Sequence, residues 1–434
     1  MNGSQRPGPR EALERWTEAC SQAGWRGEAV LEQVPVGDGF GRVLATPVHA
    51  RVSSPPQDCA AMDGIAVIAG DGLASGVLPV GTFGLIDTGD PMPAGTDAVA
   101  ERELVLIRPD GSALVTAAVR RGRNVRVRGE DFSAGMLLVP AGRRLRPADA
   151  AIAAAAGHTS VTVARRPAVA IIPTGDEIRP AGSPLGPGDI VDSNSLLLSA
   201  RATQSGARPA TSQVQPDDAD IITAEVRRVA RTADLVLVLA GSSAGRGDHT
   251  AAVLGQAGAV AVHGVAVRPG HPVLLGYAKT QSAAEVVPVI GVPGYPLAAA
   301  VIFELFALPV LARLQGPTAQ DGTAQDGTAQ DGTAQDGTAR DGTARDGIVL
   351  RAVLSRDWAS PPGIEDWVPV ALAPAAAAAS GPVATPCQGH GAGALSRLVR
   401  ADAWWPIPVG QGQFREGDIV EVLPLANAEG PAWR

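Results

Sequence analysis

Three short loops, each following a continuous run of apolar residues, carry side chains suited to binding an anion and a cation together. They contain Asp176 and Glu177; Ser242, Ser243, Gly245 and Asp248; and the turn Pro293-Gly-Tyr-Pro296. Glycines let backbone N–H groups approach a phosphate closely, and carboxylates supply the hard oxygen ligands that a divalent cation prefers. Ordinary turns and helix caps explain any one loop about as well as a ligand site does, but three such loops together favour a ligand site.

Two further groups of carboxylates and amides lie outside these loops. Asp192 and Asn194 precede a predicted helix, so helix capping is the alternative to ligand binding there. Asp58 and Asp63 follow Pro55-Pro56, and their burial is not given by the sequence. Clustered carboxylates are costly to bury unless they bind something, so either a structural or a functional interpretation is open for this loop.

Two basic segments could bind an oxyanion. Five arginines lie between Arg120 and Arg128, and Arg126 and Arg128 alternate with valines. The guanidinium of arginine can donate two hydrogen bonds at once to phosphate and other oxyanions. The common alternative is a solvated hairpin whose positive charge is balanced by Glu130 and Asp131. The second segment is the rigid turn Arg268-Pro-Gly-His271-Pro, with two groups that can be cationic.

The elements that must position these loops form an α/β pattern. Buried strands are predicted at 168–172, 234–239 and 287–292, and helices at 196–204, 217–231 and 297–314. Strands that are apolar throughout and alternate with helices indicate a parallel sheet. Ligands bind beyond the carboxyl ends of such strands, so the three loops line one crevice if the strands are neighbours.

The rest of the chain is predicted to be mainly β-rich. A helix is expected at 11–22 and another at 147–156, ending at Gly157, with short strands between 77 and 139. Residues 318–347 repeat Asp-Gly-Thr-Ala-Gln, shifting to Asp-Gly-Thr-Ala-Arg, and are expected to be a flexible linker because they cannot bury a core. Strands at 348–354, 367–372 and 418–423 predict a small C-terminal β-domain.

Composition narrows the class of protein. The 434 residues predict two to four domains, and the net charge of −8 argues against general nucleic-acid binding. Three distant cysteines make neither a CxxC pair nor a disulfide framework. We find no signal peptide and no apolar run free enough of Gly, Pro and charge to span a bilayer, so a soluble, cytoplasmic protein is expected.

Taken together, these segments resemble one family, the molybdopterin molybdotransferases of the MoeA type, which are related to the E domain of gephyrin. The resemblance is carried, in the family's order, by segments 58–64, 88–98, 124–134, 140–142, 174–177, 192–194, 241–248, 268–270 and 293–296. They span nearly the whole chain, and the set is specific although each segment alone is not.

The resemblance implies a multidomain α/β fold: a doubly wound parallel-sheet domain, a β-rich inserted domain and a C-terminal β-barrel-like domain. The expected boundaries are 1–50 with 140–166 for a discontinuous N-terminal domain, 51–139 for the insertion, 167–315 for the α/β domain, 316–347 for the linker and 348–434 for the C-terminal domain. A homodimer is implied, with the active site between the α/β domain and the inserted domain of the other subunit.

The implied reaction inserts molybdate into adenylylated molybdopterin with the help of Mg²⁺, releasing AMP and molybdenum cofactor. The substrate would be handed over by a molybdopterin adenylyltransferase. By resemblance, Asp63, Asp131, Glu177 and Asp248 are the catalytic carboxylates, and three of them (Asp63, Glu177 and Asp248) hold the metal. The implied cofactor-binding residues are Thr88, Arg126, Arg128, Asp176, Asp192, Asn194, Ser242, Ser243, Gly245, Arg268, His271, Pro293 and Pro296.

The chain also departs from the family's pattern. Arg268 and His271 replace lysines, and Tyr295 replaces an asparagine. One alternative is therefore a degenerate, non-catalytic paralogue that binds molybdopterin or acts as a scaffold. Another is a nucleotide-processing hydrolase that shares only the α/β domain, against which Asp63 and the Arg-Gly-Glu-Asp segment count because they lie outside that domain.

Overall fold

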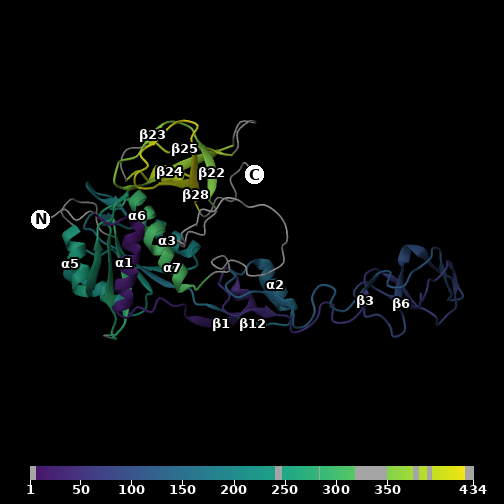
Figure 1. Ribbon diagram of the computed structural model, residues 1–434. Coiled ribbons are helices and arrows are strands. Elements are labelled where there is room, and N and C mark those ends of the chain that lie inside the picture. The colour runs from purple at the N-terminus through teal and green to yellow at the C-terminus, as the bar shows by residue number, and fades with distance from the viewer. Residues whose placement is uncertain are drawn as a thin grey trace. The chain divides into compact units, whose positions relative to one another are not determined.

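The computed structural model describes residues 6–239, 247–282, 284–317, 349–374, 381–388 and 393–425, with only the backbone given at 247 and 248. The chain forms two compact units (Figure 1). Unit 1 comprises Met1–Val30 and Arg165–Arg434, and unit 2 comprises Leu31–Ala164. The repeat tract 318–347 lies outside the described residues.

A six-stranded sheet forms the centre of unit 1, in the order β16-β13-β17-β21-β20-β18. The strands are β13 (Ala168–Pro173), β16 (Arg208–Thr211), β17 (Leu235–Leu239), β18 (Gly258–His263), β20 (Leu274–Lys279) and β21 (Val286–Val292). The first four strands in the sheet order are parallel. Strand β20 runs antiparallel to β21, and the edge strand β18 runs antiparallel to β20. Strands β13, β17 and β21 are adjacent, so the condition for their loops to share one crevice is met.

Helices cover both faces of this sheet, as a doubly wound fold requires. Helices α1 (Pro9–Gln22), α3 (Asn194–Gln204), α6 (Pro296–Ile302) and α7 (Leu308–Leu314) share one core with it. Helices α4 (Ala219–Val229) and α5 (Gly247–Ala257) share the core on the other face. Neighbouring strand residues point to opposite cores, as Ile171 and Ile172 of β13 do. The fully apolar strands follow from this double burial.

Helix α1 belongs to unit 1 and not, as expected for residues 1–50, to the N-terminal part of the discontinuous domain. The reason is a buried apolar stripe at helical spacing, formed by Ala12, Trp16 and Cys20. The indole N–H of Trp16 donates to the carbonyl oxygen of Gly276 at 2.6 Å, and its ring meets Phe306 edge-on. The helix is therefore tied to strand β20 far along the chain.

The helical stretch Pro296–Leu314 is long and apolar enough to cross a membrane by length and composition, which the sequence analysis did not anticipate. It is 72% buried inside unit 1, as the core helix of a folded domain is. A π-helical segment (Phe303–Ala307) separates α6 from α7. Pro309, which cannot donate a backbone hydrogen bond, lies just beyond this irregularity.

The C-terminal strands of unit 1 close into a five-stranded barrel, which confirms the predicted β-domain. They are β22 (Leu350–Leu354), β24 (Glu365–Ala373), β25 (Val383–Pro386), β26 (Ala403–Ile407) and β28 (Ile419–Pro424). Strands β23 (Trp358–Ala359) and β27 (Gln413–Phe414) pair beside it, and α8 (Leu395–Val399) precedes β26. Strand β19 (Val267–Arg268) pairs with β24 and so joins the barrel to the α/β sheet.

The first and last strands of unit 2 pair with each other. Strand β1 (Leu31–Pro35) pairs with β12 (Ser160–Ala164), and β2 (Val48–His49) pairs with β11 (Leu137–Val139). A 3-10 turn (Val36–Gly39) and α2 (Pro147–Ala155) share the same small core. As predicted, α2 begins at a proline and is followed by Gly157, whose φ is +91°.

Short antiparallel sheets form the segment between β2 and β11. One contains β4 (Gly64–Val67), β6 (Gly84–Ile86) and β7 (Ala98–Glu101). A second contains β5 (Gly76–Leu78), β8 (Val105–Ile107) and β9 (Ala113–Val115), with a 3-10 turn (Arg102–Leu104) between the sheets. Strand β3 (Cys59–Ala60) pairs with β10 (Val125–Arg126). The β-rich character predicted for this segment is therefore confirmed.

Candidate functional site

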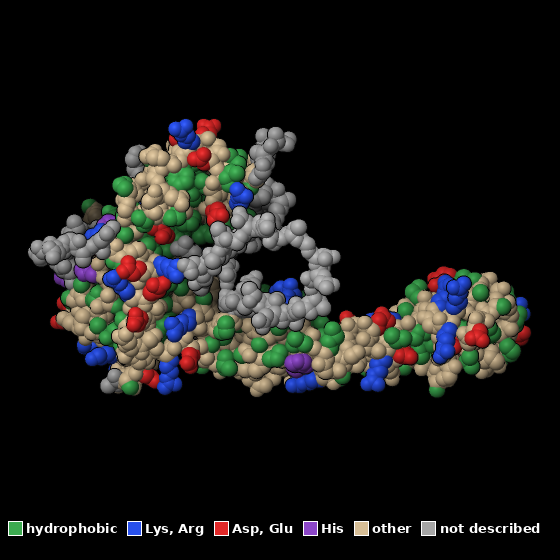
Figure 2. Space-filling view, viewed as in Figure 1, with side chains coloured by type: hydrophobic (Ala, Val, Ile, Leu, Met, Phe, Trp, Pro, Cys, Tyr) green, Lys and Arg blue, Asp and Glu red, His purple; other side chains and the backbone are tan. Residues whose placement is uncertain are grey.

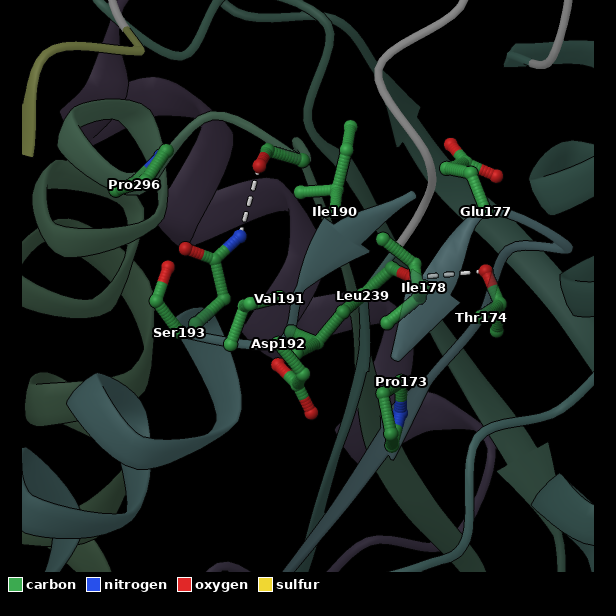
Figure 3. A pocket seen from close by; sticks show the side chains of 12 residues that line it. Pro173, Thr174, Glu177, Ile178, Ile190, Val191, Asp192, Ser193, Leu239 and Pro296 are labelled. Atoms are coloured by element: carbon green, nitrogen blue, oxygen red, sulfur yellow. Dashed lines mark hydrogen bonds between the residues drawn. The ribbon is translucent and has the colours of Figure 1, made fainter. Parts of the chain in front are cut away.

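A pocket lies beyond the carboxyl ends of the parallel strands of unit 1 (Figure 3). Its lining includes Pro173 and Leu239, which end β13 and β17, and Gly294, which follows β21. Figure 3 shows Thr174 and Glu177 on one side and Ser193 and Pro296 on the other. This is where ligands bind in open parallel sheets. Two of the three predicted loops therefore meet at one pocket, and Leu239, the last described residue before the third loop, also lines it.

The loop after β13 is shaped by Gly175. Its φ is +137°, and a Cβ there would lie only 2.9 Å from Oε2 of Glu177 and 2.7 Å from Ile178. The missing side chain allows Glu177 to fold back over the loop. Thr174 is anchored below it, since its hydroxyl donates to the carbonyl oxygen of Leu239 at 2.8 Å. The Thr-Gly-Asp-Glu segment thus holds one carboxylate at the pocket.

Asp176 and Asp189 have structural partners. Oδ1 of Asp176 accepts from the backbone N–H of Asp217 at 3.2 Å. Asp189 forms an ion pair with Arg179 at 2.9 Å and accepts from the backbone N–H of Gly186 at 2.8 Å. Among the carboxylates of this loop region, Glu177 lines the pocket and these two do not.

Asp192 and Asn194 line the pocket where helix α3 begins. Oδ1 of Asp192 accepts from the backbone N–H of Ser195 at 2.9 Å, which is the capping role that the sequence left open. The Asn194 side chain donates to the carbonyl oxygen of Gly294 at 2.8 Å and so ties α3 to the loop after β21. Its other atom, Oδ1, is buried with no partner among the described residues, which leaves an acceptor for a ligand's N–H or O–H.

In unit 2, Asp63 is held at the start of β4. Gly64 after it is required, because a Cβ there would lie 2.0 Å from the carbonyl oxygen of Ala100 on β7. Oδ1 of Asp63 accepts from both the backbone N–H and the hydroxyl of Thr88, each at 2.7 Å. These two bonds, in that order, hold the pKa of Asp63 below its usual value, and Arg102 acts in the same direction.

This geometry changes the role of Thr88. The sequence placed it among residues facing anionic groups, but both of its donors point at Asp63. Thr88 thereby keeps the exposed Asp63 carboxylate ionised and oriented, with Oδ2 left for a ligand. The two residues are 25 positions apart, and no sequence signal linked them.

Pairing of β3 with β10 places the arginine-rich segment next to the Asp58 loop. Oδ1 of Asp58 accepts from the backbone N–H of Arg128 at 2.8 Å. Three of the five arginines form ion pairs at the surface: Arg121 with Asp97, Arg123 with Glu101 and Arg126 with Glu130. Charge balancing therefore explains part of the segment. Arg128 and Asp131 are exposed at its end.

The basic turn is organised around a buried carboxylate. Arg268 donates through both Nε and Nη2 to Asp366 of β24, whose side chain is 3% exposed. This bidentate pair joins the turn to the barrel. Partial burial, followed by the charge of Arg6, lowers the pKa of His271. Near neutral pH His271 is therefore uncharged, although the sequence counted it among the groups that can be cationic.

Several predicted residues lie outside the description. Ser242, Ser243 and Gly245 belong to the undescribed loop after β17, and the side chain of Asp248 is likewise not described. No group of three His, Cys, Asp or Glu side chains gathers within the described residues. The atoms at the pocket that could coordinate a metal are oxygens. They belong to Thr174, Glu177, Asp192, Ser193 and Asn194, a set that suits a hard cation such as Mg²⁺.

Charged side chains of both signs are interspersed on the face shown in Figure 2. No continuous basic surface is visible there. A protein that displaces the counterions of nucleic acid needs such a surface.

Family models match three consecutive regions of the chain. Residues 9–157 match the MoeA N-terminal region (domain I and II), and residues 170–313 match the probable molybdopterin binding domain. Residues 351–425 match the MoeA C-terminal region (domain IV).

Curated relatives and solved structures agree with these matches. A molybdopterin molybdenumtransferase from Nostoc sp. is 33% identical over 64% of this chain and 67% of its own length. One from Bacillus subtilis is 28% identical over 93% of this chain and 91% of its own. The crystal structure of a molybdopterin biosynthesis MoeA protein from Pyrococcus horikosii matches 97% of this chain and 99% of its own, with a TM-score of 0.73 and 28% identity.

Proposed function

The chain belongs to the MoeA family of molybdopterin molybdenumtransferases, and on that premise we propose that it inserts molybdenum into adenylylated molybdopterin, releasing AMP and molybdenum cofactor. The observation that carries the proposal is the pocket beyond β13, β17 and β21, which lies in the region matching a molybdopterin-binding domain. Buried Oδ1 of Asn194 and the carboxylate of Glu177 offer acceptors there for the donor edge of a heterocycle.

Mg²⁺ is part of the proposal. Asp63, Glu177 and Asp248 would hold it, and when bound it would neutralise charge on phosphate and molybdate oxygens. The described ligands fit that role, because they are carboxylates. Thr88 keeps Asp63 ionised through two hydrogen bonds. Exposed Arg128 and Asp131 are proposed to face anionic groups and water near the reacting atoms.

The arginine at position 268 does not favour a degenerate paralogue. Of the 36 Lys and Arg residues in the chain, only Lys279 is a lysine. Arginine in place of a family lysine therefore follows the composition of the whole chain. The hydrolase alternative is not supported either, because family models match on both sides of the α/β region.

Reconstitution tests the proposed function. Purified protein is mixed with adenylylated molybdopterin, molybdate and MgCl₂, and AMP release is measured against a no-protein control. We expect AMP release that depends on both molybdate and Mg²⁺. Binding of molybdopterin without AMP release would identify the non-catalytic paralogue, and no AMP above the control would reject the enzyme.

Three further features complete the proposal: a homodimer, substrate hand-over by a molybdopterin adenylyltransferase, and action in the cytoplasm. The dimer has a specific test. If each active site takes Asp63 from one subunit and Glu177 from the other, mixing inactive Asp63→Ala and Glu177→Ala proteins after subunit exchange should restore part of the activity. A mixture as inactive as its components would contradict a shared site.

A further inference from the structure

The basic turn from Arg268 to Pro272 keeps neither of the charges that its sequence suggests. Nε and Nη2 of Arg268 both donate to the carboxylate of Asp366, so the charge of Arg268 is balanced by an ion pair within unit 1. The lowered pKa of His271 leaves its imidazole neutral. A turn expected to attract an oxyanion thus has no free cation of its own.

A cation reaches this turn from the N-terminal segment. The backbone N–H of Ala266 donates to the carbonyl oxygen of Pro7 at 2.8 Å, which fastens the segment alongside the turn. A Cβ on Gly264 would lie 3.2 Å from Nε of Arg6 and 3.2 Å from the carbonyl oxygen of His271. Gly264 has φ +80° and no side chain, so the Arg6 side chain can pass next to His271.

Arg6 is exposed, and within the described part of the chain no carboxylate forms an ion pair with it. The nearby acidic groups are engaged: Asp366 binds Arg268, and Glu365 accepts from the indole N–H of Trp367 at 2.7 Å. Arg397 acts electrostatically on Asp366 and Arg268 as well, which adds a second positive charge around one buried carboxylate. The surroundings of the turn therefore favour an anion.

The turn is also connected to the pocket. A Cβ on Gly270 would lie 2.8 Å from Ile302 and 3.7 Å from the carbonyl oxygen of Ala298, so the turn packs directly on helix α6. The first residue of that helix, Pro296, lines the pocket.

We propose that Arg6 supplies the oxyanion-binding charge of the basic turn and contacts a tetrahedral dianion there, in place of the cation that position 271 lacks. The inference rests on the proposed function, in which that dianion is molybdate. The guanidinium of Arg6 would donate charge-assisted hydrogen bonds to two molybdate oxygens. Arg6 is then a specificity-determining residue contributed by a segment that precedes the first helix.

Substitution of Arg6 in the full chain tests this inference. In AMP-release assays we expect Arg6→Ala to raise the KM for molybdate about tenfold while leaving kcat within about twofold. Arg6→Lys should retain most of the affinity. Arg10→Ala, four residues along the same segment and paired with Glu14 on the surface, is the matched control and should change nothing. Equal KM values for wild type and Arg6→Ala would overturn the inference.

A rescue experiment separates charge from structure. His271→Lys in the Arg6→Ala background restores a cation next to the same turn, and we expect it to recover molybdate affinity. Failure of the rescue together with a changed circular dichroism spectrum would show that Arg6 acts only on folding.

Binding without turnover keeps this inference distinct from the proposed function. Equilibrium dialysis against molybdate, with molybdenum measured by mass spectrometry, compares wild type, Arg6→Ala and Arg10→Ala directly. Weaker binding by Arg6→Ala alone supports the inference even if no protein releases AMP. Equal binding by all three rejects it even if the enzyme is active.

Discussion

The pocket of unit 1 and the Asp63 loop of unit 2 present carboxylates by different means. At the pocket, buried parallel strands end side by side, and Glu177 is positioned by strand β13 and by the missing side chain of Gly175. In unit 2, Asp63 is exposed just before the short strand β4 and is oriented by Thr88 through two hydrogen bonds. One site is fixed by a large core, and the other by local hydrogen bonds.

This contrast teaches how each part should respond to change. Removing core atoms under the pocket should destabilise unit 1 strongly, since interiors are close-packed. Removing Asp63 or Thr88 should alter ionisation and activity with little effect on folding, because exposed groups contribute little to stability.

The largest expected effect is on the stability of unit 1. Trp16→Ala removes a fully buried ring and its hydrogen bond to Gly276. We expect the free energy of unfolding of unit 1 to fall by about 3–5 kcal/mol. Hydrogen exchange read by mass spectrometry should show faster exchange in the sheet of unit 1 and unchanged exchange in unit 2.

Glu18→Ala, on the exposed face of the same helix, is the control and should leave exchange unchanged. Equal acceleration in both units would show that they unfold together and would contradict the contrast drawn above.

The next effect is on activity. Asp63→Ala should lower AMP release by about 100-fold or more, because the carboxylate proposed to hold Mg²⁺ is lost. Thermal unfolding should be unchanged, since the side chain is exposed. Asp58→Ala, which removes only the acceptor for the Arg128 backbone, should lower activity much less. Full activity of Asp63→Ala would refute its assigned role.

A smaller effect separates capping from ligand binding at Asp192. Asp192→Ala removes the acceptor of the Ser195 N–H and should cost about 1 kcal/mol of stability. Asp192→Ser retains a capping oxygen and should recover most of that loss. If Asp192→Ser is stable but inactive, the carboxylate binds substrate and capping is not its main role.

The smallest effect is a shift in pH dependence. The pKa of Asp63 is lower in the folded protein than in the unfolded chain. The ionised carboxylate therefore stabilises the fold above the usual aspartate pKa, and this stabilisation is lost as pH falls through the lowered pKa. Thr88→Val removes the hydroxyl but keeps the backbone donor, so the acid limb of the activity profile should move to higher pH. Thr88→Ser keeps the hydroxyl and should resemble wild type; identical profiles for all three proteins would reject the interaction.

Elements with a strong apolar pattern were predictable, and edge elements were not. Strands β13, β17 and β21 are buried throughout, so their residues form continuous apolar runs that the sequence displays. Strand β16 lies at the edge of the sheet, and its residues are mostly exposed, so it carries no such signal. Strands β18 and β20 were also missed, because β18 is mostly only partly buried and the run of β20 is interrupted by Gly276 and Tyr277.

Taken alone, the sequence determined which residues could do chemistry: the carboxylate loops, the Gly-rich turns and the basic segments, all set by residue type and short-range spacing. It also determined the parallel sheet, because burial on both faces leaves a pattern that can be read locally. Only the tertiary structure decided which polar groups meet. Thr88 reaches Asp63, Asp366 neutralises Arg268, and Arg6 approaches His271 through contacts between residues distant in the chain. Such pairings between polar side chains depend on how strands and turns pack in space, and unlike core burial they leave no periodic pattern in the order of residues.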